Sequence, residues 1–155
     1  MSLAAAVVLI ANTAYACPTI KGTWTSSRDL TMAFADKHAK LEARQAQFLD
    51  QVTGRLTLQF DGTQVKYTDP DLDVKVEGKH YRLAGARETA GYQVLFCSAH
   101  TLVVRANAPM TRKQEATIYN FVDDDTMWVY QDSADSGLRD LNIREYFVRV
   151  RQPSH

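Results

Sequence analysis

The chain has 155 residues, of which 45% are hydrophobic, and its 18 Lys and Arg residues balance its 18 Asp and Glu residues. This length suits one domain with a substantial core. The balanced charge excludes the basic surface that a nucleic-acid-binding protein needs, and we expect no nucleic-acid partner.

The first sixteen residues carry no charged side chain and end in Ala14-Tyr15-Ala16. A short apolar run before an Ala-x-Ala site is typical of a secretory signal peptide and is shorter than a membrane span. We interpret residues 1–16 as a signal peptide remnant and residues 17–155 as one domain that is periplasmic or secreted. The alternative is a buried or amphipathic helix at the N-terminus.

The chain has two cysteines, Cys17 and Cys97. In an oxidising compartment a disulfide between them is the default expectation. Closing a loop of about 80 residues stabilises a fold by about 4 kcal/mol in the chain-entropy account. The alternative is a lipid on Cys17, although Ala14 replaces the Leu usual three residues before such a cysteine. We expect membrane contact only in that case.

After a first strand that begins at Gly22, the hydrophobic period becomes helical. Apolar residues recur four or seven positions apart between Leu30 and Val52, which predicts one amphipathic helix. His38 and Gln45 occupy two positions of this stripe, and Gly54 follows its end. The stripe consists of Leu30, Phe34, Leu41, Phe48 and Val52.

From Arg55 onward the period is two, and two dipeptides are typical of tight hairpin turns. They are Asp61-Gly62 and Glu77-Gly78. The expected pairs are Phe60 with Thr63, Leu58 with Val65 and Leu56 with Tyr67 across the first turn, and Val76 with Lys79, Val74 with Tyr81 and Leu72 with Leu83 across the second.

The rest of the chain continues as a meander. We expect strands at 92–98, 101–106, 116–122, 126–131 and 143–150, and loops at 85–91, 107–113 and 132–140. Turn signals at this spacing predict a barrel and not βαβ units. The fold class is therefore mainly β, an antiparallel up-and-down barrel of about eight to ten strands with one amphipathic helix between the first and second strands.

The first strand begins Gly22-Thr23-Trp24, and the last reads Arg144-Glu145-Tyr146-Phe147-Val148-Arg149-Val150. With the barrel plan, these features resemble the calycin superfamily of lipocalins and fatty-acid-binding proteins. Gly22 and Trp24 match its structural signature. The helix position is similar to that of fatty-acid-binding proteins, whereas the lipocalin Thr-Asp-Tyr motif is missing. The resemblance implies an exported, lipocalin-like protein that binds a small hydrophobic or fatty-acid-like ligand inside the barrel.

Fatty-acid-binding proteins hold a ligand carboxylate with an Arg-x-Tyr on the final strand, and Arg144-Glu145-Tyr146 is similar. Alternation places Arg144, Tyr146, Val148 and Val150 on one face, which we expect to point inward because it carries apolar residues. A guanidinium in such a cavity would bind a carboxylate through paired hydrogen bonds. The alternative is that Arg144 lies at the strand mouth and reaches water.

Other side chains are weaker candidates for the ligand site. Arg105 could point into the barrel with Val103, but the faces of its strand are equally apolar and leave its direction open. His38 could cap a cavity from the helix, or pack at the boundary by its ring edge. Aromatic residues that could line the cavity, or fill a packed core instead, are Phe34, Tyr67, Tyr81 and Trp128.

Motifs of the common hydrolases, metalloproteases, phosphate-binding loops and redox dithiols are missing from the sequence. We therefore expect no enzymatic activity, no cofactor and no metal site. A second function is open: a small secreted barrel that binds and inhibits a protein partner through its loops, in which case the barrel would be solid.

Overall fold

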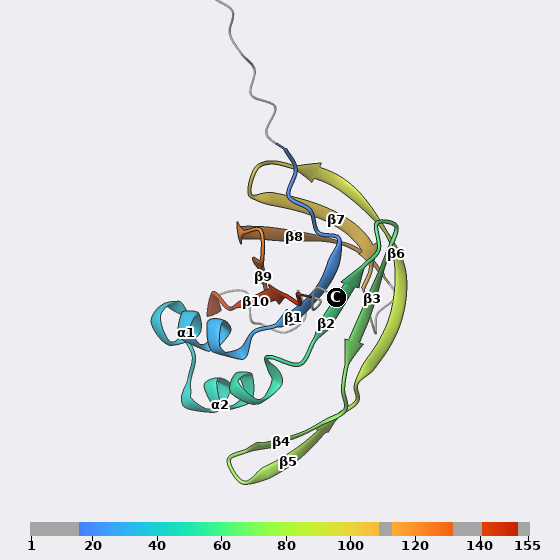
Figure 1. Ribbon diagram of the computed structural model, residues 1–155. Helices are drawn as coiled ribbons and strands as arrows, with labels where there is room; N and C mark the ends of the chain where they lie inside the picture. The colour runs from blue at the N-terminus through green and yellow to red at the C-terminus, as the bar shows by residue number, and fades with distance from the viewer. Residues whose placement is uncertain (1–15, 109–112, 132–140, 152–155) are drawn as a thin grey trace, which may run out of the picture.

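The computed structural model describes residues 16–108, 113–131 and 141–151 (Figure 1). The predictions for residues 1–15 and for the loops at 109–112 and 132–140 lie outside these ranges. The elements, in chain order, are β1 (Gly22–Ser26), α1 (Arg28–His38), α2 (Ala43–Val52), β2 (Thr57–Phe60), β3 (Gln64–Asp69), β4 (Leu72–Val76), β5 (Lys79–Leu83), β6 (Ala86–Cys97), β7 (Thr101–Asn107), β8 (Gln114–Asp123), β9 (Thr126–Tyr130) and β10 (Arg144–Arg149).

Eight of these strands form a closed antiparallel barrel in the order β1-β10-β9-β8-β7-β6-β3-β2. β1 closes it, because Trp24 is paired with Leu58 of β2 on one side and with Arg149 of β10 on the other. Both helices lie between β1 and β2 in the chain. The expected fold class, an antiparallel up-and-down barrel with helical structure at this position, is confirmed.

The interior of the barrel is packed from alternate residues of its strands, as period two requires. Trp24, Val65 and Met127 have no exposed surface, and rings meet edge to face, as in the pair Phe60 and Tyr119 with centroids 5.8 Å apart. The buried core cluster consists of Ile20, Trp24, Leu58, Phe60, Val65, Leu102, Val104, Tyr119, Phe121, Met127 and Phe147.

Trp24 closes one end of this core. Its indole Nε1 donates a hydrogen bond to the carbonyl of Ile20 at 2.8 Å, and the guanidinium of Arg149 lies 4.1 Å from the ring centroid. Arg149 Nη1 also donates to the Lys21 carbonyl at 2.6 Å, and its Nε lies 3.2 Å from a carboxylate oxygen of Asp125. One cation therefore covers the ring and anchors the segment before β1.

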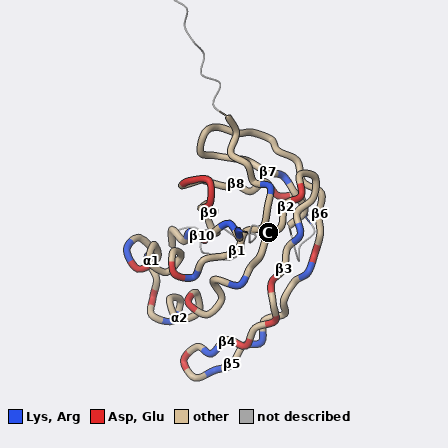
Figure 2. Tube along the Cα trace, in the orientation of Figure 1, with Lys and Arg blue, Asp and Glu red and all other residues tan. Residues whose placement is uncertain are grey.

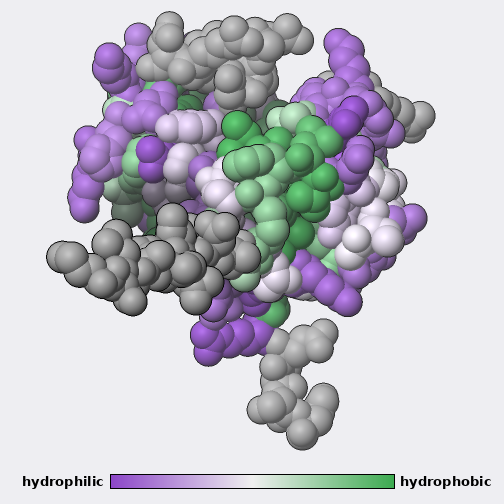
Figure 3. All heavy atoms as spheres, turned by 90° about the horizontal axis from the view of Figure 1, so that it is seen from above, coloured by the Kyte–Doolittle hydropathy of each residue, from purple (hydrophilic) through white to green (hydrophobic). Residues whose placement is uncertain are grey.

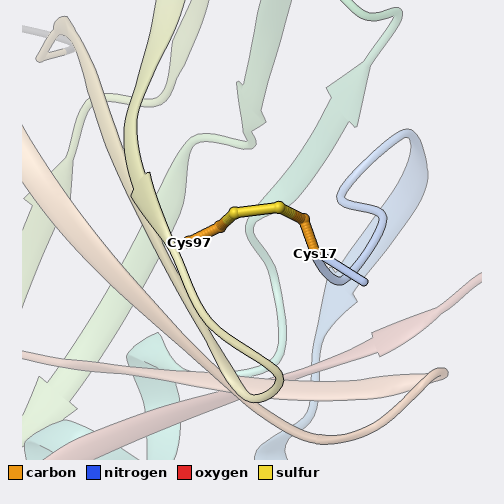
Figure 4. Close-up of a disulfide and its surroundings, with 2 residues drawn as sticks. All are labelled: Cys17 and Cys97. Atoms are coloured by element: carbon orange, nitrogen blue, oxygen red, sulfur yellow. A yellow bond between two sulfur atoms is a disulfide. The ribbon is translucent and has the colours of Figure 1, made fainter. Parts of the chain in front are cut away.

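A disulfide joins Cys17 to Cys97, with the two Cα atoms 5.5 Å apart (Figure 4). It fixes the segment before β1 to the end of β6, at the closed end of the barrel (Figure 1). The disulfide expected from the two cysteines is confirmed.

The single helix expected from Leu30 to Val52 is two helices. The break lies between His38 and Ala43, where Gln45 forms a capping box with Glu42: the Glu42 amide donates to Gln45 Oε1 at 2.8 Å. Gln45, a gap in the predicted stripe, is therefore a start signal for α2.

The two helices also bury other side chains than the stripe predicts. Thr31 and Ala35 are the buried residues of α1, and Leu49 is the buried residue of α2, whereas Leu30 and Phe48 are 40% and 41% exposed. Thr31 sits against β10, where its Oγ1 accepts a hydrogen bond from the amide of Tyr146 at 3.0 Å. A polar side chain therefore docks α1, which a search for large apolar residues misses.

The hairpin at Glu77-Gly78 has the expected pairs, including Val76 with Lys79 and Val74 with Tyr81. This hairpin, β4-β5, lies outside the barrel as a separate two-stranded sheet. Its two turn residues have φ values of 50° and 80°, which this type of turn requires.

The first hairpin has a different register. Phe60 pairs with Val65 and Leu58 with Tyr67, two residues away from the expected pairs. Asp61 is the cause, because its Oδ1 accepts the Gln64 amide at 2.7 Å, which places the turn at Gly62 and Thr63. A shift of two keeps every side chain on its expected face.

The expected loop at 85–91 is largely strand. Residues from Ala86 onward belong to β6, where Ala86 pairs with Asp69 and Gly91 pairs with Gln64 of β3. The prediction failed because glycines at both ends and the charged pair Arg87-Glu88 are typical of a loop, whereas here they lie on a long strand with many exposed positions. Gly85 itself lies at the root of the β4-β5 hairpin, where an added Cβ would collide with the carbonyl oxygen of Asp69.

We predict that replacing both cysteines, Cys17→Ser with Cys97→Ser, lowers the free energy of unfolding by about 4 kcal/mol, because the unfolded chain regains the entropy of an 80-residue loop. Urea unfolding followed by Trp fluorescence measures the change. A reductant should have a similar effect on the wild type and none on the double variant; coincident curves for all samples would contradict the prediction.

A second prediction concerns the closed end. Arg149→Ala should lower the free energy of unfolding by about 2 kcal/mol, since it removes charged hydrogen bonds and uncovers the Trp24 ring. Arg151→Ala is the matched control: Arg151 also pairs with Asp125 but is 82% exposed, and its loss should cost under about 0.5 kcal/mol. Equal effects of the two substitutions would refute this role for Arg149.

Candidate functional site

A cleft of about 640 Å³ lies at the end of the barrel opposite the disulfide, and we call it the mouth cleft. It is bounded by α2, by the β4-β5 hairpin and by the barrel rim, which gather at this end in Figure 1. Its walls are mostly apolar. Representative wall residues are Phe48 and Leu49 from α2, Tyr81 and Leu83 from the hairpin, and Leu56 from the rim.

A second space of about 230 Å³, which we call the inner cavity, lies beside the mouth cleft among residues of β2, β3, β7, β8, β9 and β10. It opens to solvent, because Glu115 and Tyr130 of its lining are exposed. Tyr67, Tyr119 and Phe147 line it. The mouth cleft and the inner cavity share three lining residues, Leu56, Gln131 and Glu145. Glu145 therefore stands where the two spaces meet.

Gln51 joins α2 to the β4-β5 hairpin at the edge of the mouth cleft. Its side-chain amide bonds to β4 as a strand residue would: Nε2 donates to the Lys75 carbonyl and Oε1 accepts from the Lys75 amide, both at 2.8 Å. Gln47 accepts the Glu77 amide at 3.2 Å one helical turn earlier. The hairpin and α2 are therefore joined along one edge of the cleft.

Glu145 is the charged residue at the base of the site, and only 5% of its surface is exposed. Its Oε1 accepts a hydrogen bond from Ser26 Oγ at 2.6 Å, and its Oε2 accepts one from Gln131 Nε2. Burial raises the pKa of the Glu145 carboxyl, the two hydrogen bonds oppose the rise, and the nearby Asp69 carboxylate adds to it.

Ser26 links this carboxyl to the helices. Its hydroxyl donates to Glu145 and accepts the amide of Gly54 at 2.9 Å, just after α2. Gly54 has a φ of +82°, and an added Cβ would lie 2.8 Å from the Cβ of Arg28. Only glycine fits this position without strain, so the chain returns from α2 to β2 on a fixed path over Glu145.

Charged groups around the mouth cleft are mainly acidic. Asp69 lines it; burial raises the pKa of that carboxyl, and the charge of Arg55 opposes the rise. Arg44 also lines it, but its Nε lies 4.0 Å from a carboxylate oxygen of Glu77, across the rim. Elsewhere Lys and Arg are interspersed with Asp and Glu along the trace, apart from the acidic turn between β8 and β9 (Figure 2).

Two of the predicted ligand residues line these spaces. Tyr67 lines the inner cavity, and Tyr81 lines the mouth cleft, where it is 39% exposed. They come from different hairpins, so the structure brings them to one end of the barrel from separate parts of the sequence.

The predicted inward face of the last strand is wrong. Glu145 and Phe147 point into the barrel, whereas Arg144 and Tyr146 lie on the outer wall beneath α1. Val150, expected on the inward face, is 47% exposed. Both faces of the last strand carry apolar residues, so alternation alone does not decide which one points inward. The face with Arg144 and Tyr146 points outward because α1 covers it.

Arg144 is held in an aromatic cluster outside the barrel. Its guanidinium lies 3.9 Å from the ring centroid of Trp128 and 4.4 Å from that of Phe34. His38 stacks on Phe34 with centroids 4.7 Å apart and is exposed. Five predicted ligand residues, Tyr146 included, thus lie in one cluster, but they pack α1 onto the sheet and line neither space.

Arg105 is exposed on β7, whose inward residues are Leu102, Val104 and Ala106. The side chain of Arg105, whose direction the sequence left open, therefore points outward.

Sequence reasoning missed the residues that shape the site, above all Glu145, Gln131 and Asp69. Glu145 lies on the face opposite to the one that the sequence analysis expected to point inward. The available signal was Phe147, the largest apolar side chain of the strand, which shares the face of Glu145 under period two.

Comparison with protein-family models, curated proteins and solved structures finds no match for this chain. In the described ranges no helix has the length and apolar character needed to cross a membrane. The same residues contain no group of three or more His, Cys, Asp or Glu placed to hold a metal ion. Function is therefore argued from the geometry of the site.

The raised pKa of Glu145 predicts a penalty in the free energy of unfolding that depends on pH. Its folded pKa exceeds the ordinary value of 4.5, so the penalty is missing below pH 4.5 and grows as the pH rises toward the folded pKa. Relative to wild type, Glu145→Gln should gain about 1.4 kcal/mol of stability over this window for each unit of pKa shift.

Urea unfolding of both proteins between pH 4 and pH 8 measures this difference. A difference that does not change with pH, or that favours the wild type increasingly as the pH rises, would show that the buried carboxyl carries no such penalty.

Proposed function

We propose that this protein is an exported, calycin-like, non-catalytic barrel that binds a small apolar molecule at its open end. The ligand occupies the mouth cleft between α2 and the β4-β5 hairpin and extends toward the inner cavity. The observation that carries the proposal is the cleft of about 640 Å³, which shares Leu56, Gln131 and Glu145 with a second space in the barrel.

The size and lining of the mouth cleft support this function. Small-molecule sites usually have volumes of about 300–1,000 Å³ and apolar walls with a few polar groups. Phe48 of α2 and Tyr81 of the hairpin both line the cleft and are 41% and 39% exposed. Apolar rings that the protein leaves uncovered gain hydrophobic free energy when a ligand covers them.

The closed end supports export and the calycin resemblance. A disulfide such as Cys17–Cys97 persists in oxidising compartments, which favours a periplasmic or secreted protein. The Gly22-Thr23-Trp24 sequence lies on the strand that closes an eight-stranded barrel, and the helices follow that strand. These features agree with the plan on which the resemblance rests.

A carboxylate head group has less support than an apolar body. Arg144 and Arg105, the two cations considered for it, both lie outside the barrel. The proposal therefore concerns an apolar ligand, and its head group must be sought from the groups that do line the site.

Binding of N-phenyl-1-naphthylamine, a neutral apolar dye that fluoresces in apolar surroundings, tests the proposal. We predict saturable binding and at least a ten-fold loss of affinity in Phe48→Glu, since a carboxylate replaces a ring in the cleft wall. Ile118→Glu is the matched control, because Ile118 is 51% exposed on β8 and lines neither space. No saturable binding, or equal loss in both variants, would contradict the proposed function.

A second candidate, binding of a protein partner, is favoured by one observation on the outer wall. Phe96 of β6 pairs with Val103 of β7, which pairs with Ile118 of β8, and Phe96 and Ile118 are 57% and 51% exposed. The face seen from above, toward the β6-β7 hairpin of Figure 1, carries a green apolar patch (Figure 3).

Affinity capture from an extract of the exporting cells separates the two candidates. A partner protein retained by wild type and Phe48→Glu but lost by Ile118→Glu would favour this second function. Failure to retain a partner, or equal retention by both variants, would remove it.

A further inference from the structure

We infer that the ligand of the mouth cleft carries a protonated amine, which binds Glu145 where the cleft meets the inner cavity. This inference rests on the proposed function and names the chemical class of its ligand. The amine binds the Glu145 carboxylate, and the apolar body of the ligand lies between α2 and the β4-β5 hairpin.

Glu145 has the capacity to accept further hydrogen bonds. A carboxylate offers about four acceptor positions on its two oxygens. Ser26 and Gln131 each use one of them. An ammonium group brings three donors, so it can bind the carboxylate without displacing either neighbour.

Among the residues that the structure describes, no cation compensates this buried carboxyl. Its hydrogen-bond partners in the described part of the chain are a neutral hydroxyl and a neutral amide, and the one charged group that acts on it is the carboxylate of Asp69. A buried carboxylate without a cation is costly, and a cation close to it removes much of that cost. An ammonium ligand therefore gains affinity here that an alcohol does not.

The charges that line both spaces select for a cation and against an anion. Among the described lining residues, the mouth cleft has Glu42, Asp69 and Glu145 against Arg44, and the inner cavity has Glu115 and Glu145 with no Lys, Arg or His. Arg44 pairs with Glu77 at the rim. A fatty acid would place its carboxylate among like charges, which costs binding free energy.

Competition between three ligands of one chain length tests the inference. N-phenyl-1-naphthylamine is bound to the disulfide-bonded protein at pH 7 and displaced by dodecylamine, dodecan-1-ol or dodecanoate, each below its micelle concentration. We expect dodecylamine to act at a concentration at least ten-fold lower than dodecan-1-ol, and dodecanoate to be the weakest of the three.

The outcomes distinguish this inference from the proposed function. If dodecanoate or dodecan-1-ol displaces the dye as well as dodecylamine does, the amine inference is wrong and apolar binding stands. If the dye does not bind the wild type, both fail. The ranking in the wild type decides the question even if no variant folds.

Substitution of Glu145 then assigns the preference to this residue. In Glu145→Gln, the concentration of dodecan-1-ol that displaces the dye should exceed that of dodecylamine by no more than about two-fold, compared with at least ten-fold in the wild type. The reason is that the amide has the shape of the carboxylate but no charge. Asp73→Asn is the control, since Asp73 is exposed on β4 and lines neither space. A preference that survives in Glu145→Gln would overturn the role of Glu145.

Discussion

The structure depends on the pairing of one five-residue strand, β1, with both ends of the sheet. Trp24 is at its centre, opposite Leu58 on one side and Arg149 on the other, and has no exposed surface. Because both pairings form, the apolar face of every barrel strand is enclosed. One end of that enclosure is sealed by the Trp24 ring, the Arg149 guanidinium and the disulfide-anchored segment, and the mouth cleft lies at the other end.

The same closure builds the candidate site. Ser26, the last residue of β1, bonds to Glu145 of β10 and to the amide of Gly54, which follows α2. One hydroxyl thus joins the two strands that close the barrel to the end of the helix that covers its mouth. A ligand bound at Glu145 would contact the point where barrel and helices meet, so binding and the local stability of this end are linked.

Local chemistry made part of this fold predictable. The Glu77-Gly78 hairpin has its predicted register, because its turn type is decided by the two residues within it. The register of the Asp61 hairpin differs from the prediction by two residues because the Asp61 side chain determines where the turn lies. Since the shift is even, each side chain stays on its predicted face of the sheet. The inward face of β10 and the burial of Glu145 were not predictable in the same way, since they depend on α1, Ser26 and Gln131, which lie far away in the sequence.

A crystal structure of the protein grown with dodecylamine tests the central claim most directly. The account predicts density for the alkyl chain between α2 and the β4-β5 hairpin, with its nitrogen within about 3.2 Å of a Glu145 carboxylate oxygen. Density for the chain on the outer wall of β6, β7 and β8, or a nitrogen that points from the mouth into solvent, would contradict it.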